Sequence, residues 1–326
     1  MTATEILAAI PKISALVVGD ICLDRWCTYD PSAADPSRET GIPRIGVVRT
    51  EITAGAGGTV ANNLAALGCA RVAVLGAIGS DGFGVELSRV LAARGVSDLC
   101  IPTASMQTFT YTKVINQRTG AEDQPRLDFI NTAPVDTDVE RQILDRLRNT
   151  AGSFDVIIVS DQAETSVGVV TPAVRSLLRE LAVAYPAKTL FADSRARIQH
   201  FRSVIAKPNQ QEGESACLSM FGRIDYTALR RHMEANLLMV THGGDGVLVV
   251  DPRGERWVRT QPVEHPVDIC GAGDSFSAGA ALALAAGATP TEAAQFGNLV
   301  ASITIMKKGT GTASPEEVRT ACKSWR

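Results

Sequence analysis

The chain has 326 residues, with 32 Lys and Arg against 35 Asp and Glu, which gives a formal net charge of −3. This near-neutral balance argues against nucleic acid or an anionic membrane surface as a partner, because neither would find an excess of positive charge. With 45% hydrophobic and 21% charged residues, the composition is typical of a folded globular protein and excludes a disordered one.

The sequence also predicts where the protein resides. Residues 1–12 contain no basic region followed by a long apolar run, so we expect no secretory signal. The most apolar stretch, residues 278–288, is too short to span a bilayer and predicts a buried helix. The seven cysteines are scattered without a C-x-x-C pair, which favours reduced thiols over a zinc site or a disulfide framework. We therefore expect a cytoplasmic protein.

Short β-branched runs alternate with segments of helical period along most of the chain. The runs that are apolar throughout predict buried strands at residues 15–19, 72–76, 156–159, 237–241 and 247–250. Residues 136–148 predict a helix whose apolar face holds Val139, Ile143, Leu144 and Leu147. This alternation predicts an α/β fold with a mainly parallel sheet covered by helices on both sides, forming a single domain over residues 1–326.

Two stretches interrupt this alternation. Residues 21–53 contain three prolines and end in a short Ile-Gly-Val-Val strand, while residues 108–117 and 126–130 alternate like half-exposed strands. These insertions, at about 21–53 and 104–132, predict a small separate sheet that acts as a lid or as a dimer contact. Its open edge offers a pairing surface for a homodimer.

The strongest chemical signal is the run Asp268-Ile-Cys-Gly-Ala-Gly-Asp274 ahead of the long apolar helix. Gly271, Ala272 and Gly273 would present three successive amides at the positive end of that helix, which is a site for a phosphate-like anion. A carboxylate at Asp274 suits a general base beside such a site. The alternative is a structural glycine turn with an acidic helix cap.

Other phosphate-binding motifs do not fit. The chain has no Gly-Lys dipeptide, which excludes a Walker-type loop, and residues 76–84 lack the G-x-G-x-x-G order of a dinucleotide fingerprint. No histidine lies at a spacing that would make Ser275 an esterase nucleophile.

The run at 268–274 resembles the D-[TV]-x-G-A-G-D signature of the ribokinase-like (PfkB) sugar kinases. Four further elements occur in that family's order: Gly19-Asp20 with Asp24, the glycine-rich turn Gly55–58, Asn209-x-x-Glu212, and Thr241-x-Gly243-x-x-Gly246. The resemblance covers residues 14–318. It implies a ribokinase-like three-layer αβα sandwich with a small β-sheet lid.

This resemblance implies transfer of the γ-phosphoryl group of ATP to a hydroxyl of a sugar or sugar phosphate. Asp274 would be the general base, and Gly271, Ala272 and Gly273 the anion hole. The residues expected along the nucleotide are Asn209, Glu212, Thr241, Gly243, Gly246 and Asn298, with Glu212 helping to place Mg²⁺ through phosphates or water. The residues expected at the substrate are Asp24, Gly55, Gly57, Thr59, Asn63, Arg126 and Asp161. Part of the family also suggests a monovalent cation such as K⁺.

From the residues alone, each of these positions has a structural alternative. Asn209 and Glu212 have the spacing of a helix capping box, and Asp24 is also common in turns. The glycines could serve tight packing between helix and strand.

Within the family, the chain looks most like the heptose-7-phosphate kinases, for example in Arg126-Leu-Asp-Phe129 and in the run 308–315. Thr59 and Glu164 depart from that branch, which has Asn and Lys at these positions, and a Glu would repel a substrate phosphate. The sugar therefore stays open. The other functions we consider are a nucleoside kinase, since Trp26 and Tyr111 offer aromatic surfaces, and a non-catalytic ligand-binding protein of the same fold.

Overall fold

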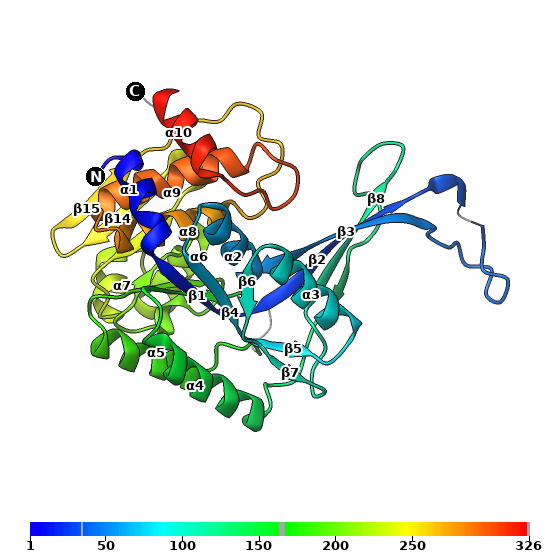
Figure 1. Cartoon of the computed structure of the whole chain (residues 1–326), viewed down its shortest axis with the longest axis horizontal. Coiled ribbons are helices and arrows are strands. Elements are labelled where there is room, and N and C mark those ends of the chain that lie inside the picture. Colours follow the sequence, from blue (N-terminus) through cyan, green and yellow to red (C-terminus); the bar gives the residue numbers. More distant parts are fainter. Residues whose placement is uncertain (34, 163–166, 325–326) are drawn as a thin grey trace.

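The computed structural model describes residues 1–33, 35–162 and 167–324. A central sheet lies between two layers of helices, and a second, smaller sheet extends from one side of this body (Figure 1). None of the helices in these ranges is long and apolar enough to cross a bilayer.

The main sheet is parallel except at one edge. Within the described ranges its strands are, in spatial order, β15 (Gly254–Val258), β14 (Val247–Asp251), β13 (Leu238–Thr241), β12 (Ile205–Ala206), β11 (Thr189–Ser194), β10 (Val156–Asp161), β1 (Ser14–Gly19), β4 (Arg71–Leu75) and β6 (Val96–Asp98). The antiparallel pairs in this sheet are β13 with β14 and β14 with β15, so β14 runs opposite to its two neighbours. The strands β5 (Ala77–Gly79) and β7 (Ile101–Thr103) form a separate parallel pair. The predicted mainly parallel sheet is confirmed, and each of the predicted buried strands is present.

Helices cover both faces of this sheet, which explains why its strands are apolar throughout. One layer holds α1 (Ala3–Ala9), α2 (Gly57–Ala66), α3 (Gly82–Ala93), α8 (Ala272–Ala285), α9 (Pro290–Thr304) and α10 (Pro315–Ser324). The other holds α4 (Thr137–Ala151), α5 (Pro172–Ala184), α6 (Gln210–Phe221) and α7 (Tyr226–His232). In β1, Ala15 and Val17 join the first core cluster, whereas Leu16 and Val18 join the second. This two-sided burial is typical of parallel sheets.

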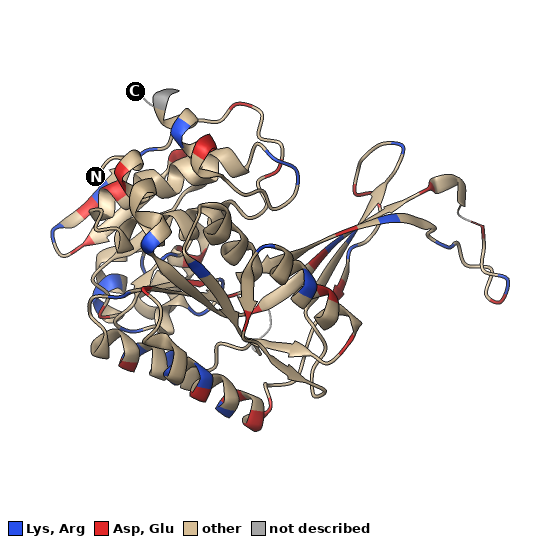
Figure 2. Ribbon diagram, viewed as in Figure 1, with Lys and Arg blue, Asp and Glu red and all other residues tan. Residues whose placement is uncertain are grey.

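The two helices predicted at residues 136–148 and 278–288 are present as α4 and α8, one in each layer. In α4, Val139, Ile143 and Leu147 are buried as expected, and the rest of the helix carries mixed acidic and basic residues (Figure 2). The apolar stretch expected at 278–288 lies mostly within α8, whose small side chains are buried against α2 and α9.

The smaller sheet, here called the lid, has the order β3 (Val47–Ala56), β2 (Ile21–Tyr29), β8 (Thr110–Asn116) and β9 (Leu127–Phe129). The half-exposed strand expected at 108–117 is confirmed by the alternating burial of β8. The short strand expected at the end of the 21–53 stretch was wrong in extent, because β3 begins at Val47 and continues to Ala56. Sequence patterns also missed β2, in which Asp24, Arg25 and Trp26 interrupt the apolar residues.

The first lid strand follows directly after a central strand of the main sheet. β2 begins immediately after Asp20, which follows the last residue of β1, Gly19. Gly19 has a φ of +138°, and a Cβ there would collide with the carbonyl oxygen of Ser160 in the neighbouring strand β10. The glycine therefore permits the turn that carries the chain from the core into the lid.

We predict that Gly19→Ala lowers the free energy of unfolding by about 2–5 kcal/mol, because backbone strain and steric overlap with β10 add together. Gly95 is a matched control, since its φ is +70° and a Cβ there would meet open space. Gly95→Ala should cost only about 1–2 kcal/mol of backbone strain. Urea unfolding measures both variants, and equal losses would contradict the role given to Ser160.

Candidate active site

Polar residues follow the carboxyl ends of successive strands in the main sheet. Asp20 follows β1, Gln162 follows β10, Arg195 follows β11, Lys207 follows β12 and His242 follows β13. The parallel strands among them point the same way, so these residues gather at one edge, where open α/β sheets bind ligands. The lid strand β2 leaves from the same edge.

The amino end of α8 is shaped by a glycine turn at this edge. Gly271 caps the helix with a φ of +77°, a left-handed conformation that favours glycine. A Cβ on Gly271 would lie 3.1 Å from Cγ2 of Thr59, and one on Gly273 would lie 3.3 Å from Nζ of Lys207. The turn is thus closely bordered by Thr59 and by a cation, and its amides lie at the positive end of the helix dipole.

Lys207 is the functional candidate that sequence patterns missed. Its side chain is only 4% exposed, and its Nζ lies 2.6 Å from Oδ2 of Asp193. The hydroxyl of Ser277 in α8 donates to the same oxygen at 3.1 Å. Burial opposes the charge on Lys207, but the carboxylates of Asp193 and Glu212 outweigh burial and raise its pKa. Lys207 therefore stays protonated beside Gly273 and adds positive charge to the turn.

Asp274 lies in the first turn of α8 and is half-buried. Burial raises the pKa of its carboxyl to about 7, and the negative charge of Asp193 acts in the same direction, while Lys207 and Arg195 oppose both. A carboxyl with a pKa near neutrality is matched to general acid–base work at physiological pH.

Asp274 opens into a cavity of about 180 Å³ between the body and the lid. Its lining residues are Asp24, Arg25, Trp26, Ala56, Thr59, Tyr111, Lys113, Arg126, Gln162, Arg195, Cys270, Gly271, Asp274 and Thr310. Across the lid, Asp24 is the register partner of Tyr111, and Trp26 is that of Lys113. Residues opposite one another on paired strands share a face, so these side chains form one wall of the cavity.

Basic side chains from both the lid and the body line this cavity. Nζ of Lys113 lies 3.8 Å from Glu122, and Arg126 stacks 5.1 Å from the ring centre of Tyr111. From the body, Nε of Arg195 donates to Oε1 of Gln162 at 2.9 Å.

Asp24 is the acidic residue on the lid wall. Its burial raises the pKa of its carboxyl to about 6, and Lys113 partly opposes that shift. Together with the basic side chains, Asp24 gives the cavity the means to orient a ligand that has both hydroxyl and anionic groups.

Some of the expected substrate residues line the cavity and others support it. Asp24, Thr59 and Arg126 are lining residues, as are Gly271 and Asp274 of the signature run. A Cβ on Gly55 would collide with the carboxylate of Asp24, so that glycine makes room for a lining residue. Gly57 begins α2, and its amide donates to the carbonyl of Asp20 at 2.9 Å.

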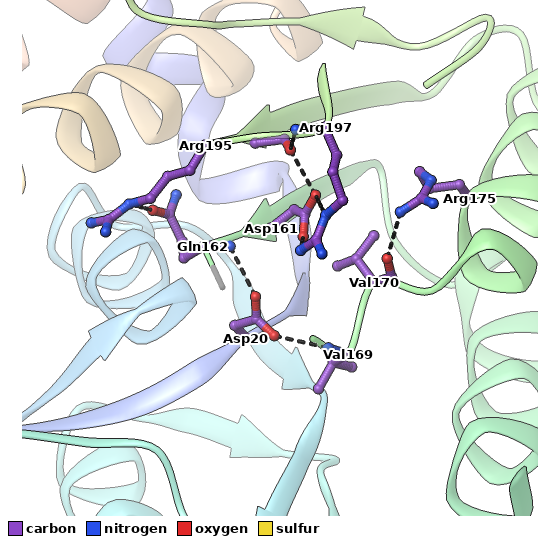
Figure 3. A network of polar contacts seen from close by, with 9 residues as sticks. Asp20, Asp161, Gln162, Val169, Val170, Arg175, Arg195 and Arg197 are labelled. Carbon is purple, nitrogen blue, oxygen red and sulfur yellow. Dashed lines mark hydrogen bonds and ion pairs between the residues drawn. The ribbon is translucent and has the colours of Figure 1, made fainter. Parts of the chain in front are cut away.

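Two expected substrate residues, Asn63 and Asp161, do not line the cavity. Asn63 is fully buried in α2, where its Nδ2 donates to the carbonyl of Thr59 at 3.0 Å. Asp161 is also fully buried; it accepts a hydrogen bond from the Ser194 hydroxyl at 2.6 Å and forms an ion pair with Arg197 (Figure 3). Both side chains are therefore engaged in contacts within the body and are absent from the cavity lining. Glu164 lies outside the described residues.

The fold brings the expected nucleotide residues together in two groups. Asn209 forms a parallel bridge with Thr241. Asn209 and Glu212 also form the capping box of α6, which is the structural role that their spacing allows. Gly243 lies in the exposed loop between β13 and β14.

Gly246 and Asn298 form the second group, because both lie against the carbonyl oxygen of Val258. Nδ2 of Asn298 donates to that oxygen at 3.4 Å, and a Cβ on Gly246 would collide with it.

A larger cavity of about 560 Å³ is lined in part by residues 104–107 and 130–136 and shares no lining residue with the Asp274 cavity. We place the candidate active site in the smaller cavity because it contains the helix terminus and the carboxylate. Within the described part of the chain, no three His, Cys, Asp or Glu residues are grouped to hold a metal. A divalent ion here would need oxygen ligands from a substrate.

A helix terminus beside a carboxylate in a lidded cavity is an arrangement suited to phosphoryl transfer to a hydroxyl group. Residues 14–317 match the model of the pfkB family carbohydrate kinases, and the chain belongs to that family. It is a sugar kinase by family, as the signature run predicts.

Similar proteins agree with this assignment. The chain is 33% identical over 327 residues to the bifunctional protein HldE of Geobacter metallireducens and 30% identical over 324 residues to that of Pelobacter propionicus. Each alignment covers 96% of this chain and 64% of the relative, so the chain spans less than two thirds of these proteins.

Solved structures show the same fold. Ribokinase from Thermotoga maritima has a TM-score of 0.69 at 20% identity, covering 95% of this chain and 99% of that one. Phosphofructokinase-2 from Escherichia coli, in complex with substrates and products, has a TM-score of 0.72 at 19% identity, covering 96% and 99%. The predicted ribokinase-like three-layer sandwich is confirmed.

Proposed function

We propose that this protein transfers the γ-phosphoryl group of ATP to a hydroxyl of a sugar phosphate, with Asp274 as the general base. The observation that carries the proposal is the position of this carboxyl, whose pKa is about 7, in the first turn of α8 and facing the lidded cavity. A base and an anion site at the same helix end are what phosphoryl transfer to an alcohol requires.

In this mechanism the sugar hydroxyl lies in the cavity and loses its proton to the carboxylate of Asp274. The amides of Gly271, Ala272 and Gly273, at the positive end of α8, stabilise the charge on the transferring phosphoryl group. Lys207 lies against Gly273 and strengthens that field from a buried position. Asp193 holds Lys207 in place, so its role is to position the cation.

The nucleotide would lie along the surface formed by Asn209, Glu212, Thr241, Gly243, Gly246 and Asn298. Glu212 is half-buried near Lys207 and Asp193, and burial raises its pKa. It would help place Mg²⁺, which when bound neutralises phosphate charge.

A monovalent cation such as K⁺ would fit beside the turn at 268–271. There Oδ1 of Asp268 accepts from the amide of Cys270 at 2.9 Å, and Oδ2 accepts from that of Gly309 at 3.1 Å.

The basic side chains of the cavity support a phosphorylated substrate. Lys113, Arg126 and Arg195 reach the cavity from two elements of the lid and from the body, whereas an unphosphorylated sugar needs no such charge. They supply positive charge even though Glu164 replaces the Lys expected for the heptose-phosphate branch. They also favour a sugar phosphate over a nucleoside.

The lid offers a candidate contact surface for a homodimer. Ile42, Ile45, Val47 and Val48, at the outer end of the β2–β3 ribbon, are exposed apolar residues, and this ribbon projects well beyond the body (Figure 1). A second copy that pairs with the lid would cover this surface.

Asp274→Asn should lower kcat by about 10²- to 10⁴-fold, because the amide cannot accept the hydroxyl proton. Binding of ATP should persist, since the amides of the turn are unchanged. Steady-state kinetics and nucleotide titration measure the two effects. Asp145→Asn, on the exposed side of α4, is the control. A kcat near that of the natural enzyme would show that Asp274 is not the base.

The pH profile follows from the raised pKa of Asp274. Only the carboxylate accepts a proton, so kcat/KM should fall about tenfold per pH unit below pH 7 and level off above it. Asp193→Asn removes a negative charge that helps raise this pKa, and the falling limb should therefore move to lower pH. An unchanged limb in that variant would contradict the electrostatic coupling between Asp193 and Asp274.

Lys113→Met should raise KM for a phosphorylated sugar by about 10- to 100-fold, the cost of one charge-assisted hydrogen bond. Turnover of the unphosphorylated analogue should stay the same, because that substrate makes no such bond. Lys12→Met is the control, because this exposed lysine precedes the amino end of β1, whereas the lid follows the carboxyl end of that strand. Equal losses on both substrates would contradict a phosphate-binding lid.

A further inference from the structure

A second charged cavity lies on the body, at the start of α5. Its volume is about 390 Å³, and its lining residues are Pro172, Arg175, Ser176, Arg179, His200 and Arg202. None of these residues lines the Asp274 cavity. Three arginines and one histidine thus meet around one hollow, with no acidic residue in its lining.

Two of these arginines are held by uncharged groups. Nη1 of Arg175 donates to the carbonyl of Val170 at 2.7 Å (Figure 3). Nη1 of Arg202 donates to the carbonyls of Gln199 and Phe201 at 2.7 and 2.8 Å. Within the described ranges, neither guanidinium forms an ion pair with a carboxylate. Each guanidinium has five N–H donors, so these bonds orient it without neutralising it.

Of the three arginines in the lining, only Arg179 is paired with a carboxylate within the described ranges. Arg179 is paired with Glu234 at 3.0 Å, and Nη2 of Arg202 lies 2.8 Å from Nε2 of His232. Behind them, Asp161 is already paired with Arg197. The carboxylates in this region are therefore engaged by other arginines.

Positive charges in this cluster act on one another. Burial lowers the pKa of His200, and the positive charges of Arg175 and Arg202 lower it further. Burial also lowers the pKa of Arg175; Asp161 opposes this shift, and the smaller repulsion from Arg197 adds to it. An anion in the cavity would relieve this repulsion.

We propose that this cavity binds a phosphoryl dianion, either inorganic phosphate or the end of a phosphate monoester, at a site separate from the active site. Planar guanidinium groups bind phosphate oxygens in pairs, and Arg175 and Arg202 approach the cavity from two different elements. The amino end of α5, which has 13 residues, adds its dipole on the same side. The occupant is thus selected by charge and by paired oxygens, not by apolar shape.

The imidazole of His200 lies in the cavity wall and reports directly on an occupant. We expect millimolar phosphate to raise the pKa of His200 by about 0.5 unit or more, because a negative charge offsets Arg175 and Arg202. Proton NMR titration of the histidine resonances, assigned by single substitutions, measures this shift. Chloride at the same ionic strength should not produce it. Glycerol 3-phosphate, run in parallel, shows whether a monoester binds as phosphate does.

The resonance of His242 distinguishes phosphate binding at the active site from binding at this cavity, because His242 lies in the loop proposed to contact the nucleotide. Phosphate that binds only there would move the resonance of His242 and leave that of His200 in place, which would overturn the proposal. An equal response of His200 to chloride would also overturn it.

Arg202→Gln and Arg175→Gln should each reduce the response of His200 to phosphate, and the double variant should lose it. Arg94→Gln, on the exposed end of α3, is the matched control and should keep the full response. Thermal unfolding checks that each variant is folded, and the two single variants keep the test valid if the double variant is not. A full response in both single variants would show that these arginines do not bind the anion.

Discussion

The buried ion pair between Lys207 and Asp193 is the interaction on which the candidate site depends. It holds a cation against Gly273 at the amino end of α8. Burial raises the pKa of Asp274, Asp193 raises it further, and Lys207 limits the rise. The same pair thus serves both the anion hole and the base. Such a pair is costly to bury, and removing one partner of a buried pair typically costs about 3–5 kcal/mol. Its retention at the sheet edge is consistent with a functional use.

The second constraint is the direct passage from the core into the lid. β1 is buried on both faces, and the chain continues through Gly19 and Asp20 into β2, which carries Asp24. The lid wall is therefore anchored to the rigid centre of the sheet on one side. Its register then places Tyr111 and Lys113 of β8 beside Asp24 and Trp26. The proposed substrate residues on the lid are positioned by strand pairing, which holds side chains more precisely than a loop does.

The sequence predicts well those structural elements whose residue pattern is set by burial or by local backbone chemistry. The apolar strands, the amphipathic helix α4 and the glycine turn before α8 all follow from periodicity and local chemistry. β2 was missed because its charged residues face the cavity, so its alternation does not look like that of a core strand. Lys207 and Lys113 belong to no motif, and only their strands bring them to the site. Asn63 and Asp161 lie close in sequence to the lining residues Thr59 and Gln162, yet both side chains are fully buried.

The central claim is that the amides at the amino end of α8 bind the terminal phosphate of the nucleotide. A crystal structure with Mg²⁺ and a non-hydrolysable ATP analogue tests this most directly. We expect the γ-phosphate oxygens to lie within about 3.2 Å of the amide nitrogens of Gly271, Ala272 and Gly273, with the Asp274 carboxylate on the lid side. A γ-phosphate that binds away from these amides would contradict the account.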